Sequence, residues 1–285
     1  MKTVTTIALL GKKQEMSPQL FSRYWRDVHG VLAARIPGFD SYVQFHLAVP
    51  VSGLRLPKSL NRPVASALRW HGVAEVGFAD ASARAGLAGS DVARLIQADE
   101  CHVFSRSLLY SLEPGASRTC LRRRNGSGQA SFFLLLGRRE ALVPQQLLEP
   151  VEQLLLPALA SHEAISRLRI HALASGDPEL WQTAGVDNRQ TSSSAFDIVL
   201  QIDGDATCLR ESIQAVLAQS PVELLDVLGK VQLYPVAARY TMVEHGKPTQ
   251  LGLRGLDALS TIIAAGADNQ LDDAILDCLY GVRLS

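Results

Sequence analysis

The stretch LLGKK at residues 9–13 recurs as LLGRR at residues 135–139, 126 residues further along the chain. Other residues recur at offsets of 125 to 131: Pro18 and Pro144, His46 and His171, Glu113 and Glu244, Gly115 and Gly246. A nearly constant offset across separated segments is the mark of an internal repeat. The sequence therefore predicts two copies of one structural unit.

The composition is that of a folded protein with one large domain or two ordinary ones. Of the 285 residues, 47% are hydrophobic and 20% are charged, which suits a chain with a sizeable core. Positive and negative residues number 28 each, so we expect neither nucleic acid nor a membrane surface as a partner. No apolar run reaches the roughly 20 residues that span a bilayer. Residues 3–10 suit a first strand better than a signal peptide. The four cysteines are isolated from one another in the sequence, which favours free thiols and a location in the reducing cytoplasm.

The first 112 residues follow the order β-α-β-β-α-β. Ser17 before Pro18 marks the start of a helix that Pro37-Gly38 ends. The other predicted elements are strands at residues 3–10, 42–49, 70–78 and 101–112, and a second helix at residues 81–98. This order is typical of a ferredoxin-like unit.

The same order is predicted in residues 130–246, after a linker rich in Gly, Ser and Arg at residues 113–129. The strands are expected at 130–138, 166–173, 195–202 and 230–243, with helices at 144–160 and 206–219. A polar insertion follows the second of these strands. Residues 247–285 form an extension in which two amphipathic helices are expected, at 255–265 and 270–280.

Three segments of the first unit resemble the EthD family: FSRYWRDVHG at 21–30, WHGVAEVGFADA at 70–81 and ADECHVFS at 98–105. The resemblance covers residues 1–112 and places this unit in the dimeric α/β-barrel superfamily. It implies an α+β fold in which two ferredoxin-like units pack sheet to sheet. Because two units lie in one chain, the resemblance implies an intramolecular barrel with a C-terminal helical extension.

His29 is the first candidate for chemistry, because imidazole can accept and return a proton near neutral pH. The second unit has Leu155 at the position of His29 and Val151 at the position of Trp25, so the two copies differ in their polar helix. A helix histidine bonded to a nearby carbonyl or carboxylate is the alternative. Tyr24 and Trp25 could line a pocket for a flat substrate, although Trp25 also suits plain core.

Polar residues on the strands are further candidates for substrate binding: Tyr42, His46, His71 and Glu75. His46, His71 and Glu75 are predicted on the faces opposite the helices, where a polar network between the sheets is the alternative to a substrate cavity. Asp99, in the acidic pair that matches the family before the last strand, either ends a helix or reaches His29.

The residues point to no metal site and no nucleotide cofactor, because metal-ligand spacings, phosphate loops and dinucleotide fingerprints are all missing. The superfamily includes cofactor-free lyases and isomerases, haem proteins and monooxygenases, and fold alone does not choose among them. We expect a cofactor-independent lyase or isomerase for a hydrophobic aromatic or cyclic molecule, with His29 as acid and base. The alternatives are a non-catalytic binding protein of a degradation pathway, and a haem-dependent or monooxygenase enzyme with His46 or His171 as a haem ligand. A homodimer of the fused barrel is also expected.

Overall fold

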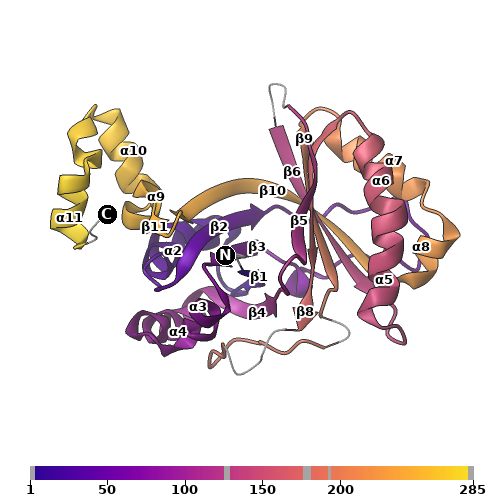
Figure 1. Cartoon of the computed structure of the whole chain (residues 1–285), viewed down its shortest axis with the longest axis horizontal. Helices are drawn as coiled ribbons and strands as arrows, with labels where there is room; N and C mark the ends of the chain where they lie inside the picture. The colour runs from indigo at the N-terminus through magenta and orange to yellow at the C-terminus, as the bar shows by residue number, and fades with distance from the viewer. Residues whose placement is uncertain (1–3, 125–128, 176–180, 192–193, 282–285) are drawn as a thin grey trace.

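The computed structural model describes residues 4–124, 129–175, 181–191 and 194–281. Its strands form one curled antiparallel sheet in the order β5-β7-β9-β6-β10-β2-β3-β1-β4-β8, and β11 pairs with β10 off this path (Figure 1). Strand β10 (Leu228–Glu244) is 17 residues long, and it pairs with β6 near its start and with β2 further on. The chain is therefore a mixed α+β protein in which one strand belongs to both halves of the sheet.

The first half contains four strands in the spatial order β4-β1-β3-β2. These strands are β1 (Val4–Lys12), β2 (Phe39–Leu47), β3 (Gly72–Phe78) and β4 (Phe104–Ser111). Its helical segments are α1 (Pro18–Tyr24), η1 (Trp25–His29), α2 (Gly30–Ala33), η2 (Ser66–Leu68), α3 (Ala81–Ala85), η3 (Leu87–Gly89) and α4 (Asp91–Val103). Each predicted strand of this half is present within a few residues of its expected bounds, whereas the helix predicted at 81–98 is divided into α3, η3 and α4 and extends to Val103.

The second half has the corresponding spatial order, β10-β6-β9-β7. Its remaining strands are β5 (Ser117–Arg122), β6 (Gln129–Arg138), β7 (Ile165–Ala172), β8 (Ala174–Ser175) and β9 (Ile198–Asp205). Its helical segments are α5 (Pro144–Pro150), η4 (Val151–Leu155), α6 (Leu156–Ser161), α7 (Leu209–Ala218) and α8 (Val222–Val227). These helices cover the outer face of their strands (Figure 1).

The first helix of each half is interrupted by a π-helical turn. Ser17 caps α1, because its hydroxyl accepts a hydrogen bond from the backbone N–H of Leu20 at 3.1 Å. The turn η1 then covers residues 25–29, and η4 covers residues 151–155, which is 126 residues further on. A π-helical turn inserted in an α-helix is frequent at functional sites.

The core consists of three clusters of buried side chains. One lies between the helices and strands of each half. The third lies between the two groups of strands and combines side chains from both, among them Phe45, Val73, Phe133 and Val199. The face of each group of strands that turns away from its helices is thus packed against the other group.

Two regions differ from the expected organisation. The predicted linker contains β5, which pairs with β7; its residues are largely exposed, as at a sheet edge, and their sequence lacks the apolar alternation of a strand. Residues 125–128 of that linker lie outside the described residues. The extension contains β11 (Lys247–Pro248), α9 (Gln250–Arg254), α10 (Leu256–Ala264), η5 (Asp268–Leu271) and α11 (Asp273–Tyr280), and residues 282–285 lie outside the description. None of the described helices has the length and apolar character needed to cross a bilayer.

Candidate functional site

Trp25 is the fully buried centre of the helix that carries the candidate residues. Its ring stacks on the His46 imidazole, with the centroids 4.4 Å apart. On β3, a Cβ atom at Gly72 would lie 2.5 Å from the Trp25 ring, so only glycine allows the indole to approach the strand this closely. The role of plain core that the sequence allowed for Trp25 therefore matches its position.

His29 ends the π-helical turn and is held by a carboxylate on α4. Its Nδ1 lies 2.9 Å from Oδ2 of Asp99, and the Tyr24 hydroxyl donates to Oδ1 of the same carboxylate at 2.5 Å. The side chain of His29 is 5% exposed, and its ring lies edge-on to Phe104 with the centroids 5.2 Å apart. Of the two alternatives left open for Asp99, contact with His29 is the one that occurs.

The Asp99 carboxylate is held in its charged form. Burial raises the pKa of this group, but the hydrogen bonds from His29 and Tyr24 outweigh burial and lower the pKa overall. Burial, together with the hydrogen bond to Asp99, raises the pKa of Tyr24 to about 12. Tyr24, Asp99 and His29 therefore form a row of a neutral phenol, a carboxylate and an imidazole, in which Asp99 orients His29.

A small cavity of about 80 Å³ lies between this helix and the sheet. His29 and Trp25 line it from the helix, and Tyr42 lines it from β2. Most of the other walls are apolar: Ala8, Leu10, Ala33, Ile36, Phe39, Ala74, Val76, Phe78, Leu87, Ile96, Phe104, Leu109. Thr6 adds a hydroxyl from β1 that is buried and has no hydrogen-bond partner among the described residues. A polar atom with no partner in an otherwise apolar cavity is suited to a ligand or a water molecule.

Glu100 is a second acid at the same cavity. It is 6% exposed, and burial raises its pKa, although His29 and two hydrogen bonds act in the opposite direction. The donors of those bonds come from the polar insertion of the second half: Trp181 Nε1 donates at 3.0 Å, and the Thr183 hydroxyl donates to the other carboxylate oxygen. No sequence pattern predicts these three residues as a group. An isolated tryptophan in a polar segment was the one available signal.

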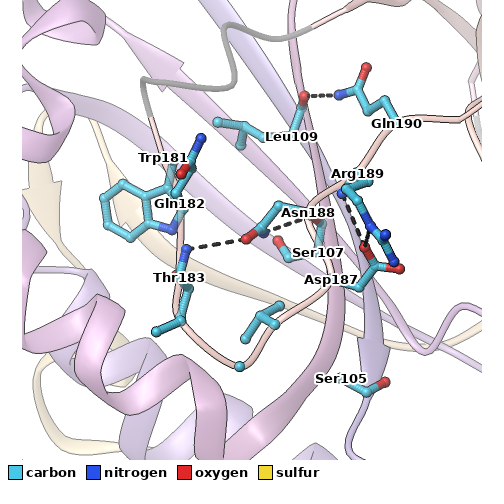
Figure 2. Close-up of a pocket in the computed structure, with 13 residues that line it drawn as sticks. Ser105, Ser107, Leu109, Trp181, Gln182, Thr183, Asp187, Asn188, Arg189 and Gln190 are labelled. Carbon is cyan, nitrogen blue, oxygen red and sulfur yellow. Dashed lines mark hydrogen bonds and ion pairs between the residues drawn. The ribbon is translucent and has the colours of Figure 1, made fainter.

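The insertion also forms an outer pocket of about 1060 Å³, which Figure 2 shows. Asn188 anchors the insertion to β4, because its side chain accepts from the Thr183 N–H at 3.1 Å and donates to the Ser107 carbonyl at 3.0 Å. Trp181, Ser107 and Leu109 line both this pocket and the inner cavity. The indole of Trp181 thus forms part of the wall between the two spaces.

The predicted orientation of His46 is wrong. Its ring faces the helix, where Nδ1 lies 2.8 Å from the Ser22 hydroxyl and Nε2 lies 3.1 Å from Gln44 Oε1. Burial lowers the pKa of His46 to about 3, with Arg26 acting in the same direction. The helix side of β2 carries the polar residues because Val43 and Phe45 occupy the opposite face, between the two groups of strands.

His71 was also predicted on the face opposite the helices, and this prediction is wrong too. It precedes β3, its ring lies 5.9 Å from that of Phe21 on α1, and its Nδ1 accepts from the backbone N–H of Lys12 at 3.3 Å. Burial lowers its pKa to about 4. Neither His46 nor His71 lines the cavity beside His29.

Glu75 does lie between the two groups of strands, as expected. It forms an ion pair of 2.6 Å with Arg169 Nη1, and the fully buried His171 lies close enough to lower its pKa further. Burial alone would raise the pKa of Glu75, but the nearby positive groups outweigh burial and the pKa is lowered overall. Glu75 does not line the His29 cavity, so its position fits the alternative of a polar network between the sheets.

The described residues contain no group of three or more His, Cys, Asp or Glu side chains that could hold a metal ion. The two histidines considered as haem ligands are poorly placed for that role. Both ring nitrogens of His46 are hydrogen-bonded, and His171 is 0% exposed in the inter-sheet core.

Comparisons with known proteins agree with this fold. The EthD domain family matches residues 13–107. The structure of an anthrone oxidase-like protein has a TM-score of 0.51 at 11% identity, covering 85% of this chain and 94% of its own. At this identity, the likeness shows the fold alone.

Two proposed monooxygenases are also similar in structure. One, from Lactobacillus acidophilus NCFM, has a TM-score of 0.47 at 9% identity and covers 87% of this chain and 98% of its own. The other, from Fusobacterium nucleatum subsp. nucleatum ATCC 25586, has a TM-score of 0.49 at 5% identity and covers 86% of this chain and 95% of its own. A search of curated protein sequences found no match.

Proposed function

We propose that this protein, in which residues 13–107 form an EthD domain, binds a small hydrophobic molecule beside His29 and moves a proton to and from it. The observation that carries the proposal is that His29 lines a mostly apolar cavity while its Nδ1 lies 2.9 Å from Asp99 Oδ2. A base oriented by a carboxylate is the arrangement that general acid–base catalysis requires.

The proton step uses His29 as a neutral base. When Nδ1–H donates to Asp99, the lone pair of the imidazole remains on Nε2. This atom removes a proton from a carbon next to a carbonyl group, and the C–H electron pair moves into the carbonyl to give an enolate. Asp99 stabilises the imidazolium, which then returns its proton to a carbon of the substrate. Return to a different carbon gives an isomerase, and loss of a leaving group from the enolate gives a lyase.

Glu100 supplies the matching acid. Burial raises the pKa of Glu100, so its carboxyl group is protonated more readily than that of an exposed glutamate, and in that form it can donate a hydrogen bond to the enolate oxygen. His29 as the base and Glu100 as the acid, both lining one cavity, would provide both halves of the proton transfer without a cofactor. The Thr6 hydroxyl, which is without a partner in the described structure, offers a further hydrogen bond to the substrate.

Entry of a cyclic substrate requires Trp181 to move. The cavity of about 80 Å³ is smaller than the roughly 300–1,000 Å³ of typical ligand sites. Displacement of the indole toward the outer pocket would join the two spaces and free one oxygen of Glu100. Substrate binding and exposure of the acid would then be coupled.

The proposal includes an origin by duplication, with the two halves forming an intramolecular barrel. The corresponding strand orders and the π-helical turns at residues 25–29 and 151–155 support it. Because the second turn carries Val151 and Leu155 in place of Trp25 and His29, the proposal assigns the chemistry to the first half alone.

The uncharged aromatic ketone 2-tetralone, which has an acidic C–H next to its carbonyl, tests the proposal. In deuterated buffer, the wild-type protein is expected to bind it saturably and to speed deuterium incorporation at that carbon, followed by NMR. Binding without faster exchange would contradict catalysis and favour the non-catalytic binding protein. Oxygen uptake during the reaction would instead favour an oxygenase, and absence of both binding and exchange would refute the proposal.

A further inference from the structure

A second pocket, of about 370 Å³, lies between the loop before β3 and the first residues of β10. Its volume is in the range of small-ligand sites, and it shares no lining residue with the cavity beside His29. Three of its lining residues are the cations Arg62, Arg106 and Lys230. No Asp or Glu is found among the described residues that line it.

Each half of the chain contributes one cation stacked on one aromatic ring. The guanidinium carbon of Arg106 lies 3.8 Å from the centroid of the Trp70 ring, and Lys230 Nζ lies 4.5 Å from that of Phe196. Trp70 and Phe196 are 126 residues apart, and Arg106 and Lys230 are 124 apart, close to the offset between the LLGKK and LLGRR segments. The two stacked pairs therefore occupy corresponding positions in the two halves.

The glycines of those two segments lie opposite the cations, and Gly137 makes room for Lys230. Gly11 is the partner of Arg106 in the sheet register, and Gly137 is the partner of Lys230. A Cβ atom at Gly137 would lie 2.5 Å from Cε of Lys230, and one at Gly11 would lie 3.4 Å from Cβ of Arg106. The lysine chain thus lies directly on the backbone of Gly137.

Two tyrosines, one from each half, accept hydrogen bonds from the backbone of the stacked aromatic residue in the other half. The hydroxyl of Tyr110, in the first half, accepts from the Phe196 N–H at 3.0 Å, and that of Tyr234, in the second half, accepts from the Trp70 N–H at 3.2 Å. Both tyrosines are buried. These two hydrogen bonds hold the backbone at the two aromatic residues of the pocket in place.

The cations repel one another in this setting. Burial lowers the pKa of Lys230 to about 8, and Arg106 and Arg138 act in the same direction. Arg138 is paired with Asp197, whose Oδ2 also accepts from the Arg138 backbone N–H at 2.8 Å, and Arg106 donates to the Leu68 carbonyl at 2.7 Å. A bound anion would offset the repulsion between Arg106 and Lys230.

We propose that this pocket binds a small organic anion, with a carboxylate or phosphate group between Arg106 and Lys230 and an apolar body against Leu60 and Leu68. Arginine and lysine side chains recognise both groups through charge-assisted hydrogen bonds. This inference does not depend on the proton chemistry proposed for His29.

Calorimetric titration of the full chain with benzoate and with phenyl phosphate tests this site. At least one of the two is expected to bind saturably, and the uncharged analogue benzyl alcohol is not. The Lys230→Met variant keeps the apolar stem over Gly137 and should lower the affinity about tenfold or more. The Gly137→Ala variant, which displaces that stem, should weaken binding as well, whereas the matched control Lys13→Met, on an exposed lysine outside the pocket, should bind like the wild type.

The inference is overturned if neither anion binds, if benzyl alcohol binds as well as benzoate, or if Lys230→Met keeps wild-type affinity. Thermal melting of each variant establishes that it is folded, and Arg106→Met provides a second charge-removing variant should Lys230→Met misfold. Binding of uncharged 2-tetralone should be unaffected by Lys230→Met. Failure of this site and failure of the function proposed at His29 are thereby distinguished.

Discussion

His29 Nδ1 lies 2.9 Å from Asp99 Oδ2, a contact that joins the π-helical turn of the first helix to α4 across 70 residues of sequence. The Tyr24 hydroxyl holds the other oxygen of the same carboxylate. An imidazole bonded in this way has one tautomer and one orientation, with Nε2 left for a substrate proton.

The variant Asp99→Asn should retain the fold and lose most of the exchange activity. An amide neither fixes the required tautomer nor stabilises the imidazolium, so we expect kcat for deuterium exchange to fall about 10²- to 10⁴-fold. The matched control is Asp91→Asn, because Asp91 is exposed and forms an ion pair with Arg94 on the surface of α4. Equal rates for Asp99→Asn and the wild type would show that the carboxylate does not assist His29.

The variant Glu100→Gln should separate catalysis from stability. Because the folded state raises the pKa of Glu100, ionisation destabilises the fold progressively as the pH rises above the usual 4.5. Glutamine does not ionise, so the unfolding free energy of the variant, measured by urea denaturation, should fall less between about pH 5 and about pH 8 than that of the wild type. The kcat for exchange should fall about tenfold or more, because the acid is lost.

Its control is Glu113→Gln, at an exposed position outside the cavity. A Glu100→Gln protein with full activity would exclude Glu100 as the acid. The same pH dependence of stability in Glu100→Gln and the wild type would show that Glu100 does not contribute through a raised pKa.

The variant Trp181→Ala should open the inner cavity to the outer pocket. The indole is 8% exposed, and its loss should lower the unfolding free energy by about 3 kcal/mol or more. The rate of association with 2-tetralone, measured by stopped-flow fluorescence, should nevertheless rise, because the wall between the two spaces is removed. A Trp181→Phe variant, which retains a large ring without the donor to Glu100, should bind at a rate closer to the wild type. An unchanged rate in Trp181→Ala would place the entry route elsewhere.

Stability should fall in mild acid because His46 is buried in its neutral form. Its pKa is about 3 in the fold against 6.5 ordinarily, so its contribution is present above pH 6.5 and is lost as the pH falls below that value. Between about pH 7 and about pH 5, the loss should be about 2 kcal/mol. In His46→Gln, this part of the pH dependence should disappear, whereas the exposed-site control His102→Gln should keep it. Identical pH profiles for His46→Gln and the wild type would contradict the assignment.

Most of the architecture could be predicted from the sequence because its local signals agree with one another. Ser17 and Pro18 start the first helix as the sequence indicates, and every predicted strand is found. The strand β5 was missed because an exposed edge strand does not need the apolar alternation that identifies a buried one.

The site was predicted less well than the fold, because it depends on which helices, strands and loops come together in space. Alternation along β2 separates two faces but does not say which face turns toward the helix, and His46 was therefore placed on the wrong side. Gln44 lies on the helix side because its side chain donates to the Trp25 carbonyl at 3.0 Å, a partner that no local pattern reveals. The bond from Trp181 to Glu100 spans 81 residues and joins the two halves, so it could not be read from either segment alone.

The most direct test of the account is the kcat for deuterium exchange into 2-tetralone by His29→Gln. The account predicts that this variant binds the ketone with near wild-type affinity and exchanges at the uncatalysed rate, whereas His102→Gln exchanges like the wild type. Wild-type exchange by a folded His29→Gln protein would contradict the central claim that His29 carries the proton.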